Sequence, residues 1–428
     1  MTVLPDARFR GSAWPDQTVF WQVYPLGFTG APVRPRVDTE RVPTPRLRHL
    51  LGWLDHWQAL GCGGLLLGPI FTSTSHGYDT TDHLCIDPRL GTETDFDALV
   101  TACRARGIRL VLDGVFNHVG AAHPRYQRAL QNQTAAENRL FRIDWTSGTA
   151  VPADFEGHGD LIALNHSAPE VIDLVATIMT TWLKRGIDGW RLDAAYAVPP
   201  EFWAAILARV RESFPQAWFL GEMIHGDYAD YVAVSGIDSV TQYELWKASW
   251  SSLVDANFYE LDHALGRHNQ LLTSFIPQTF IGNHDVTRIA TRVGPERAVL
   301  AMAILATVGG IPSIYAGDED GFTGTKYERF GGDDEIRPPF PPDPADLPLD
   351  GSGMRQHHRE LLTLRRQRPW LVQAHTETLA LTNTRYAYAA LGDTDQRIDV
   401  ILDLDPLVAE ISQGGEPLWS YRPPPSAG

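Results

Sequence analysis

The sequence predicts an α/β protein: a (β/α)₈ TIM barrel with a small insertion after strand 3 and a short C-terminal β module. Short apolar runs with strand character alternate with helical patterns along most of the chain, which is the order expected for a parallel barrel. Four of these runs end in polar groups that can do chemistry, and a barrel places its active site at the C-terminal ends of its strands. The 428 residues are enough for one barrel of about 250 residues and two smaller parts.

The strands are separated by segments with helical periodicity. Leucines recur at helical spacing over residues 46–60, and Gly61 supplies a C-terminal stop. Residues 94–106 form the next predicted helix, which Gly107 closes. The eight strands are expected at residues 19–25, 64–67, 108–112, 189–194, 217–222, 239–243, 279–285 and 311–316.

Two parts of the chain depart from this order. Residues 118–167 are polar, rich in glycine and too long for an ordinary loop in a compact domain, so we expect an insertion there. The helix after it begins with a capping-box pattern, Ser167 to Glu170, with a proline in the first turn. Residues 354–366 are expected to form a closing helix. The predicted parts are a catalytic barrel at 1–117 and 168–369, an insertion at 118–167 and a C-terminal β module at 370–428.

Composition excludes several classes of partner. The net charge of −16 argues against nucleic acid or an anionic membrane, because phosphate binding needs a basic surface. No apolar run approaches the roughly 18 residues of a membrane span. The first ten residues lack an apolar signal core, so we expect a cytoplasmic protein. The three cysteines have no metal-ligand spacing and are expected to be reduced.

The chemistry centres on Arg191 and Asp193. These side chains lie two residues apart in a strand-like run, so both point to the same side. Arg191 is expected to hold Asp193 ionised, as a carboxylate nucleophile requires, although an ordinary ion pair closing a strand end would show the same pattern. Polar groups also end three other runs, at residues 113–118, 220–222 and 280–285.

These four stretches, taken in order, resemble the four short regions of the α-amylase superfamily of retaining glycoside hydrolases. Residues 76–79 and 309–319 add to the resemblance, which extends over most of the chain, from about residue 19 to about residue 368. All four regions in this order are far more specific than any one motif. The chain is closest in look to the cyclomaltodextrinase and neopullulanase group, or to cyclic maltosyl-maltose hydrolases.

The resemblance implies three catalytic carboxyl groups. Asp193 matches the nucleophile, Glu222 the acid/base and Asp285 the third carboxylate, which stabilises the transition state. An apolar surround would raise the pKa of Glu222 toward the value that a general acid needs. Arg191 is assigned to the substrate-binding residues that the resemblance implies. Asp113, by contrast, is expected to be structural.

Five further positions match substrate-binding residues of the superfamily. Tyr78 matches its stacking aromatic residue, and His118 and His284 its hydroxyl-binding histidines. Asp333 and Arg337 resemble an acid/arginine pair that binds substrate. Each histidine is also compatible with a purely structural role, and the Asp333 loop with a solvated charged loop.

Two departures from the superfamily pattern narrow the function. Many α-amylases hold calcium between an Asn at position 117 and a carboxylate in the insertion, but Ala163 stands at the carboxylate position. We therefore expect no metal site and no cofactor. Residues 194–197 also lack the Lys-His that often follows the nucleophile in α-amylases.

The preferred function is hydrolysis of α-glucosidic bonds, mainly α-1,4 and also α-1,6, in malto-oligosaccharides or cyclic α-glucans by a monomer or homodimer. Ser75 replaces the Asp by which exo-acting oligo-1,6-glucosidases bind a terminal glucose, so an open cleft is expected. Alternatives are a transglycosylase or isomerase such as a trehalose synthase, an exo-acting α-glucosidase and, remotely, a non-catalytic carbohydrate-binding relative. Retention of all three carboxylates argues against the last of these.

Overall fold

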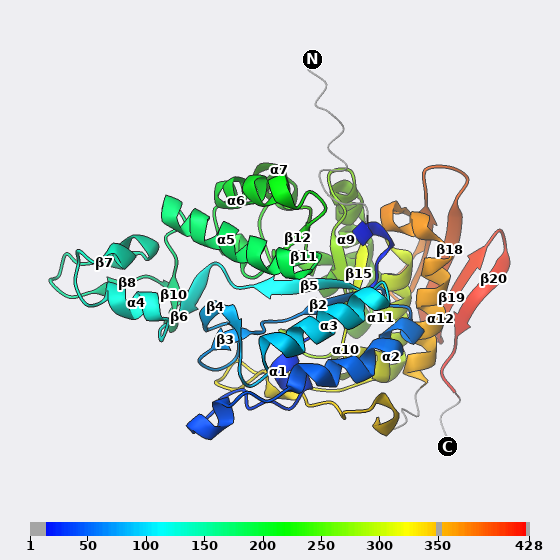
Figure 1. The fold of residues 1–428 in the computed structure, drawn as a ribbon. Coiled ribbons are helices and arrows are strands. Elements are labelled where there is room, and N and C mark those ends of the chain that lie inside the picture. Colours follow the sequence, from blue (N-terminus) through cyan, green and yellow to red (C-terminus); the bar gives the residue numbers. More distant parts are fainter. Residues whose placement is uncertain (1–13, 348–352, 425–428) are drawn as a thin grey trace, which may run out of the picture.

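The computed structural model describes residues 14–347 and 353–424, and its centre is an eight-stranded parallel sheet (Figure 1). Strands that follow one another in the chain are neighbours in the sheet, as βαβ units require. An isolated parallel bridge from Thr241 to Gln278 joins the two edges, so the sheet closes into the predicted (β/α)₈ barrel. The barrel strands are β1 (Phe20–Val23), β2 (Gly64–Leu67), β5 (Arg109–Gly114), β11 (Gly189–Leu192), β12 (Trp218–Gly221), β13 (Ser239–Val240), β14 (Gln278–Phe280) and β15 (Ile311–Tyr315).

Apolar side chains fill the barrel interior on the side of the N-terminal ends of the strands. The ring of Trp218 stacks on that of Phe20 with centroids 5.1 Å apart, and Leu66, Val111 and Ile311 belong to the same buried cluster. Side chains alternate between the two faces of a strand, so the next inward residues toward the C-terminal ends continue the same rows. The polar residues described below therefore lie inside the barrel on the C-terminal side of this apolar cluster.

Helices surround the sheet (Figure 1). The segment expected as one helix at 46–60 divides into a 3₁₀ turn, η3 (Arg46–Trp53), and a shorter α-helix, which ends at Gly61 with a left-handed φ of 110°. The α-helices are α1 (Pro25–Phe28), α2 (Leu54–Leu60), α3 (Glu93–Ala105), α5 (Pro169–Arg185), α6 (Pro200–Ser213), α7 (Tyr228–Ser235), α8 (Tyr243–Val254), α9 (Phe258–Leu272), α10 (Ile289–Val293), α11 (Pro295–Thr307) and α12 (Met354–Arg366). Further 3₁₀ turns are η1 (Trp14–Gln17), η2 (Asp38–Arg41), η5 (Ala195–Ala197), η6 (Asp318–Asp320), η7 (Asp334–Ile336), η8 (Pro344–Asp346) and η9 (Pro369–Gln373).

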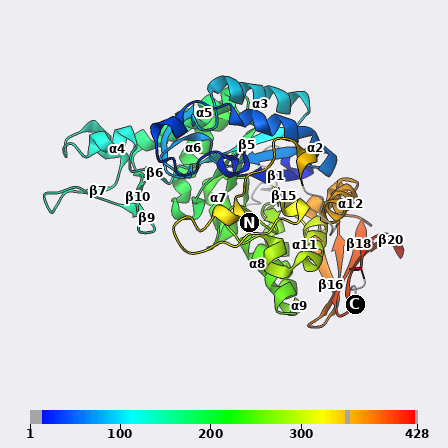
Figure 2. The ribbon, with the colours of Figure 1, turned by 90° about the horizontal axis from the view of Figure 1, so that it is seen from below.

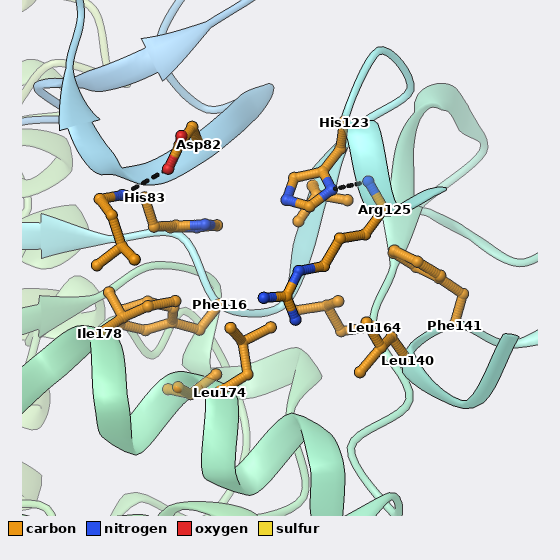
Figure 3. A pocket seen from close by; sticks show the side chains of 13 residues that line it. Asp82, His83, Phe116, His123, Arg125, Leu140, Phe141, Leu164, Leu174 and Ile178 are labelled. Carbon is orange, nitrogen blue, oxygen red and sulfur yellow. Dashed lines mark hydrogen bonds between the residues drawn. The ribbon is translucent and has the colours of Figure 1, made fainter. Parts of the chain in front are cut away.

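The segment after β5 projects from one side of the barrel (Figures 1 and 2). Its elements are β6 (His118–Gly120), α4 (Pro124–Ala129), η4 (Ala136–Leu140), β7 (Ile143–Asp144), β8 (Val151–Pro152), β9 (Asp154–Phe155) and β10 (His158–Ala163). An apolar cavity of about 70 Å³ lies where this segment meets α5 and the β3 (Phe71–Ser73) and β4 (Thr80–Ile86) hairpin, with Phe116, Leu140 and Ile178 in its walls (Figure 3). None of the three predicted catalytic carboxylates lines this cavity, and its walls also include Asp82, His83, His123 and Arg125 (Figure 3).

The chain ends in an antiparallel sheet on the opposite side of the barrel (Figures 1 and 2). Five strands follow one another as a meander, where the sequence predicted three short β runs. They are β16 (His375–Leu381), β17 (Arg385–Leu391), β18 (Arg397–Leu404), β19 (Leu407–Gln413) and β20 (Glu416–Tyr421). None of the described helices is both long enough and apolar enough to span a bilayer. All three cysteines are free, and Cys85 is exposed.

The capping box expected at the start of α5 is wrong. The helix begins at Pro169, its N-cap residue is Ala168, and no side chain caps it. Ser167 lies one residue too early, and its hydroxyl donates to Asn165 Oδ1 at 2.7 Å. The pattern of residue types was present, but the proline fixed the first turn one position later than the pattern requires.

Replacing Ser167 with alanine should therefore change the free energy of unfolding by less than about 0.5 kcal/mol. Asp227 is the matched control, because its side chain accepts from the Asp230 N–H at 3.0 Å and caps α7. Asp227→Ala should lower the free energy of unfolding by about 1 kcal/mol. Denaturant titration of the two variants tests this, and an equal loss in both would restore Ser167 as a cap.

Candidate active site

The guanidinium of Arg191 lies at the centre of the polar cluster, on the C-terminal side of the apolar cluster. It projects from β11, and the barrel register sets Arg191 beside Asp113 of β5. Its Nη1 contacts both carboxylate oxygens of Asp113, at 2.7 and 2.8 Å, and Asp193 Oδ1 at 3.2 Å. Its Nη2 lies 2.7 Å from Glu222 Oε1. One buried cation thus holds three carboxyl groups from three consecutive strands, and the structural role expected for Asp113 is consistent with these contacts.

A tight turn after Asp193 positions Glu222. Ala194 has a left-handed φ of 46°, and its N–H donates to Glu222 Oε2 at 2.9 Å. The Tyr243 hydroxyl donates to Glu222 Oε1 at 3.4 Å, and Asn283 Nδ2 in turn donates to that hydroxyl at 2.8 Å. Glu222 is therefore held from both sides, as a group that must transfer a proton at one fixed place should be.

Asp285 is oriented by a second arginine. Arg337 Nη2 donates to Asp285 Oδ1 at 2.8 Å and lies 3.1 Å from Asp333 Oδ2. The Arg337 side chain is only 8% exposed, and its guanidinium lies over the Tyr24 ring at 4.5 Å from the centroid. The alternative of a solvated charged loop is therefore wrong for Arg337, which packs within the cluster.

The pKa values separate Asp285 from the other two carboxyl groups. Burial raises the pKa of Glu222 more than the charge of Arg191 lowers it. Burial and then the Glu222 carboxylate raise the pKa of Asp193 well above its usual range, so Arg191 does not by itself keep Asp193 ionised, contrary to expectation. For Asp285, burial also opposes ionisation, but His284 and then Arg337 and Arg191 outweigh it and lower the pKa to about 2. Asp193 and Glu222 thus compete for a proton that Asp285 does not bind.

His284 and Tyr78 connect Asp285 to Asp113. The His284 Nδ1 atom accepts from Gln22 Nε2 at 3.1 Å, which leaves the proton on Nε2, and Nε2 lies 3.2 Å from Asp285 Oδ2. The Tyr78 hydroxyl contacts His284 Nε2 and donates to Asp113 Oδ2 at 3.1 Å. Burial lowers the pKa of His284 to about 3, so its ring is neutral and Arg337 is the cation that acts on Asp285.

His118 lies next to this group, with both ring nitrogens bonded to protein. Its Nδ1 accepts from Asn117 at 3.1 Å, so Nε2 carries the proton and donates to the backbone oxygen of Tyr78 at 3.1 Å. Its ring stacks on Phe155 with centroids 4.8 Å apart. In the free protein these contacts make His118 a support for the Tyr78 backbone.

Several residues of this cluster were not predicted from the sequence. Gln22 follows Phe20 on the inward row of β1, so strand alternation could have identified it. Tyr24 and Tyr243 lie where a strand gives way to a helix, a position that could have marked them as candidates. Tyr196, three residues after Asp193, donates to the Glu156 carboxylate at 3.0 Å, a contact between β-barrel and insertion that no local pattern announces.

The residues do not suit the calcium site of many relatives. Ala163 lies on β10 opposite His118 of β6, and its methyl group is buried. Asn117 Nδ2 already donates to His118. Calcium binds through several oxygen ligands, and a buried methyl group supplies none. Calcium therefore has no part in the chemistry inferred below.

Comparison with known protein families identifies the family of this chain. The model of the alpha-amylase catalytic domain matches residues 38–158 and 153–340. The chain belongs to the alpha-amylase family. Both the predicted fold class and the predicted family are confirmed.

Curated relatives in the alpha-amylase family include a cyclomaltodextrinase from Geobacillus thermopakistaniensis, 29% identical over 94% of this chain and 71% of the relative. Neopullulanase 2 from Thermoactinomyces vulgaris is 28% identical over 96% of this chain and 74% of the relative. The matches cover between 51% and 74% of the length of the relatives, so the relatives are longer than the region they share with this chain.

Solved structures extend the likeness to almost the whole chain. A cyclic α-maltosyl-(1→6)-maltose hydrolase from Arthrobacter globiformis, solved with cyclic α-maltosyl-(1→6)-maltose, superimposes with a TM-score of 0.79 at 27% identity and 92% coverage of both chains. A cyclomaltodextrinase structure gives a TM-score of 0.81 at 25% identity, over 96% of this chain and 74% of that one.

The shared proton of Asp193 and Glu222 predicts a bell-shaped pH dependence of kcat/KM. Activity should rise with pH as the pair loses its first proton and fall as it loses the second, because one group must be ionised and the other protonated. Both pKa values are raised, so the maximum should lie above the usual carboxyl range, toward neutral pH. Initial rates between about pH 4 and pH 9 test this. A profile that stays flat at alkaline pH would exclude a protonated carboxyl group as the acid.

Proposed function

We propose that this alpha-amylase family protein is a retaining glycoside hydrolase that cleaves α-glucosidic bonds in malto-oligosaccharides or cyclic α-glucans. The observation that carries the proposal is the grouping of Asp193, Glu222 and Asp285 around two buried arginines, Arg191 and Arg337. Retaining hydrolysis needs a nucleophilic carboxylate and a protonated carboxylic acid, and the competition of Asp193 and Glu222 for one proton supplies that combination.

The proposed reaction proceeds by two displacements. Asp193 attacks the anomeric carbon while Glu222 gives its proton to the leaving oxygen, which forms a glycosyl ester on Asp193. Glu222 then removes a proton from water, and that water hydrolyses the ester with net retention. Asp285, which stays ionised, supports the positive charge that develops on the sugar ring and can accept hydrogen bonds from its hydroxyl groups.

Open space on two sides of the cluster supports an internal or cyclic substrate. On one side a hollow of about 510 Å³ is lined by Tyr24 and Arg337. On another side a groove of about 920 Å³ is lined by Tyr243 and His225. Neither hollow is lined by a catalytic carboxyl group, but Arg337 contacts Asp285 and Tyr243 contacts Glu222, so each hollow adjoins one side of the cluster. In the proposed function these hollows receive the parts of the sugar chain on either side of the cleaved bond.

The contacts of Ser75 support the same substrate class. Its hydroxyl donates to Asp79 Oδ2 at 2.7 Å, so it is engaged within the protein. A neutral side chain held in this way offers no charge-assisted hydrogen bond to a free chain end. Small glucans of this kind are compatible with a cytoplasmic location, and one relative is named an intracellular maltogenic amylase, from Bacillus subtilis, 28% identical over 74% of this chain.

The roles of the carboxyl groups predict the behaviour of two variants. Asp193→Ala and Glu222→Gln should each lower kcat by about 10³-fold or more, because each removes a group that takes part in bond making or breaking. In the Asp193→Ala protein, azide added as an external nucleophile should form a β-glycosyl azide, whereas Glu222→Gln should yield an α-glycosyl azide. Proton NMR of the first product of the wild type should show the α-anomer.

Asp238→Asn is the matched control for these variants. Asp238 is also a buried carboxyl group paired with an arginine, Arg211 at 2.7 Å, but it lies at the opposite end of β12. The Asp238→Asn substitution should lower the melting temperature and leave kcat within about threefold of the wild type. A β-anomer as the first product would contradict retention, and near-normal activity of either catalytic variant would contradict its assignment.

The open cleft predicts a ranking of substrates. Cyclomaltodextrins, cyclic maltosyl-maltose or maltotriose should give the highest kcat/KM, with maltose or longer fragments released, and p-nitrophenyl α-glucoside and raw starch should react poorly. Chromatography of early products measures this, and the Asp193→Ala protein serves as the control for contaminating activity. Isomaltose or p-nitrophenyl α-glucoside as the best substrate, with glucose as the sole product, would instead indicate an exo-acting glucosidase. Trehalose or transfer products in excess of hydrolysis would indicate an isomerase or transglycosylase.

A further inference from the structure

A second group of acidic side chains lies away from the catalytic cluster, where the turn after β15 meets α2 and α12. Glu319 and Asp320 come from the 3₁₀ turn η6 and are buried. His56 comes from α2 and is partly exposed to solvent. One ligand atom from each of these three residues lies within 4.8 Å of the others. The group therefore combines one imidazole and two carboxylates in a small space.

The ligand atoms are incompletely used by the protein. Asp320 has a relative exposure of only 7%, and its Oδ2 has no hydrogen-bond partner among the described residues. His56 Nε2 also has none within that part of the chain. Arg355 Nε contacts Asp320 only through Oδ1. Buried polar atoms are nearly always satisfied, so these two atoms indicate a missing partner.

The charges around the group favour a cation as that partner. Three consecutive acidic residues are buried in η6, and arginines pair with the outer two, Arg288 with Asp318 at 2.8 Å and Arg355 with Asp320. The contacts of Glu319 are to neutral donors, since Trp21 Nε1 and the Gly317 N–H each donate to it at 2.8 Å. Glu319 is therefore the one acidic residue of η6 without an arginine partner in the described structure.

We propose that His56, Glu319 and Asp320 bind a divalent transition-metal cation of the zinc class. One imidazole and two carboxylates are a ligand set that zinc accepts, with water in the fourth position. Calcium is disfavoured, because it needs six to eight oxygen ligands and this group contains a nitrogen ligand. The three ligand atoms already lie within 4.8 Å of one another, and the His56 side chain is partly exposed at the surface of the group. This site differs from the calcium position that Ala163 removes, and it revises the expectation that the chain holds no metal.

The bound cation would be structural. The three ligands are not among the residues of the catalytic cluster, and no carboxylate of that cluster contacts them in the described structure. The ion instead would connect α2, which follows the first strand, to the turn after the eighth strand, two elements beside the paired strands β1 and β15. Its binding should therefore stabilise the closed barrel and leave the chemistry unchanged.

The test uses the full chain, dialysed against EDTA and then freed of chelator. Zinc chloride should raise the melting temperature by about 2 °C or more, and calcium chloride should not. Metal analysis after gel filtration should find one zinc ion per chain. Cobalt(II) should bind to the same site and give the visible absorption bands of a four-coordinate ion, which report the ligand set without any assay of activity.

Variants assign the site and separate it from the proposed function. His56→Gln and Asp320→Asn should each abolish the zinc-induced shift and the cobalt bands, while kcat stays within about twofold of the wild type. His375→Ala is the control, because His375 is exposed on β16, and it should keep both signals. Absence of zinc binding by the wild type, or an unchanged shift in both His56→Gln and Asp320→Asn, would overturn the proposal and would leave the glycosidase assignment untouched.

Discussion

The catalytic end of this barrel depends on one buried cation, Arg191. Burying a guanidinium is costly unless acceptors satisfy it, and for Arg191 the barrel supplies anionic partners from adjacent strands: Asp113 of β5, and Asp193 and Glu222 at the ends of β11 and β12. Each carboxyl group in turn is tolerated inside the protein because the arginine is there. The arginine and the carboxyl groups thus offset the cost of burying one another. They can do so only because the strand register places them side by side.

That cluster also decides how the protons are distributed. The buried cation contacts three neighbouring carboxyl groups, and burial raises the pKa values of all three, Asp113, Asp193 and Glu222, so Asp193 and Glu222 compete for protons. Asp285 escapes this competition because it has its own arginine, Arg337, which also contacts Asp333. The proposed reaction requires one acid, Glu222, and two carboxylates, Asp193 and Asp285, and the opposite pKa shifts of Glu222 and Asp285 favour that division.

The scaffold keeps its stabilising elements and its reactive elements at different places. Apolar side chains such as Phe20 and Trp218 fill the barrel on the side of the N-terminal ends of the strands and carry the packing, so the inward positions at the C-terminal ends are free to be polar. The proposed metal site at His56 lies beside the paired strands β1 and β15, away from the catalytic carboxyl groups. Substitutions in the apolar packing and substitutions in the polar cluster therefore affect different parts of this fold.

The sequence alone determined the order of the elements and the position of the reactive groups along each strand. Alternation placed Arg191 and Asp193 on one side, and the four motifs in order indicated the barrel and the family, because these signals are local and periodic. Only the tertiary structure decided which partners meet: that Arg191 contacts Glu222 more closely than Asp193, that Arg337 orients Asp285, and that Ser167 is not a cap. These contacts join residues distant in sequence, or depend on a shift of a single residue, and they are set by register, burial and backbone geometry, which residue types do not specify.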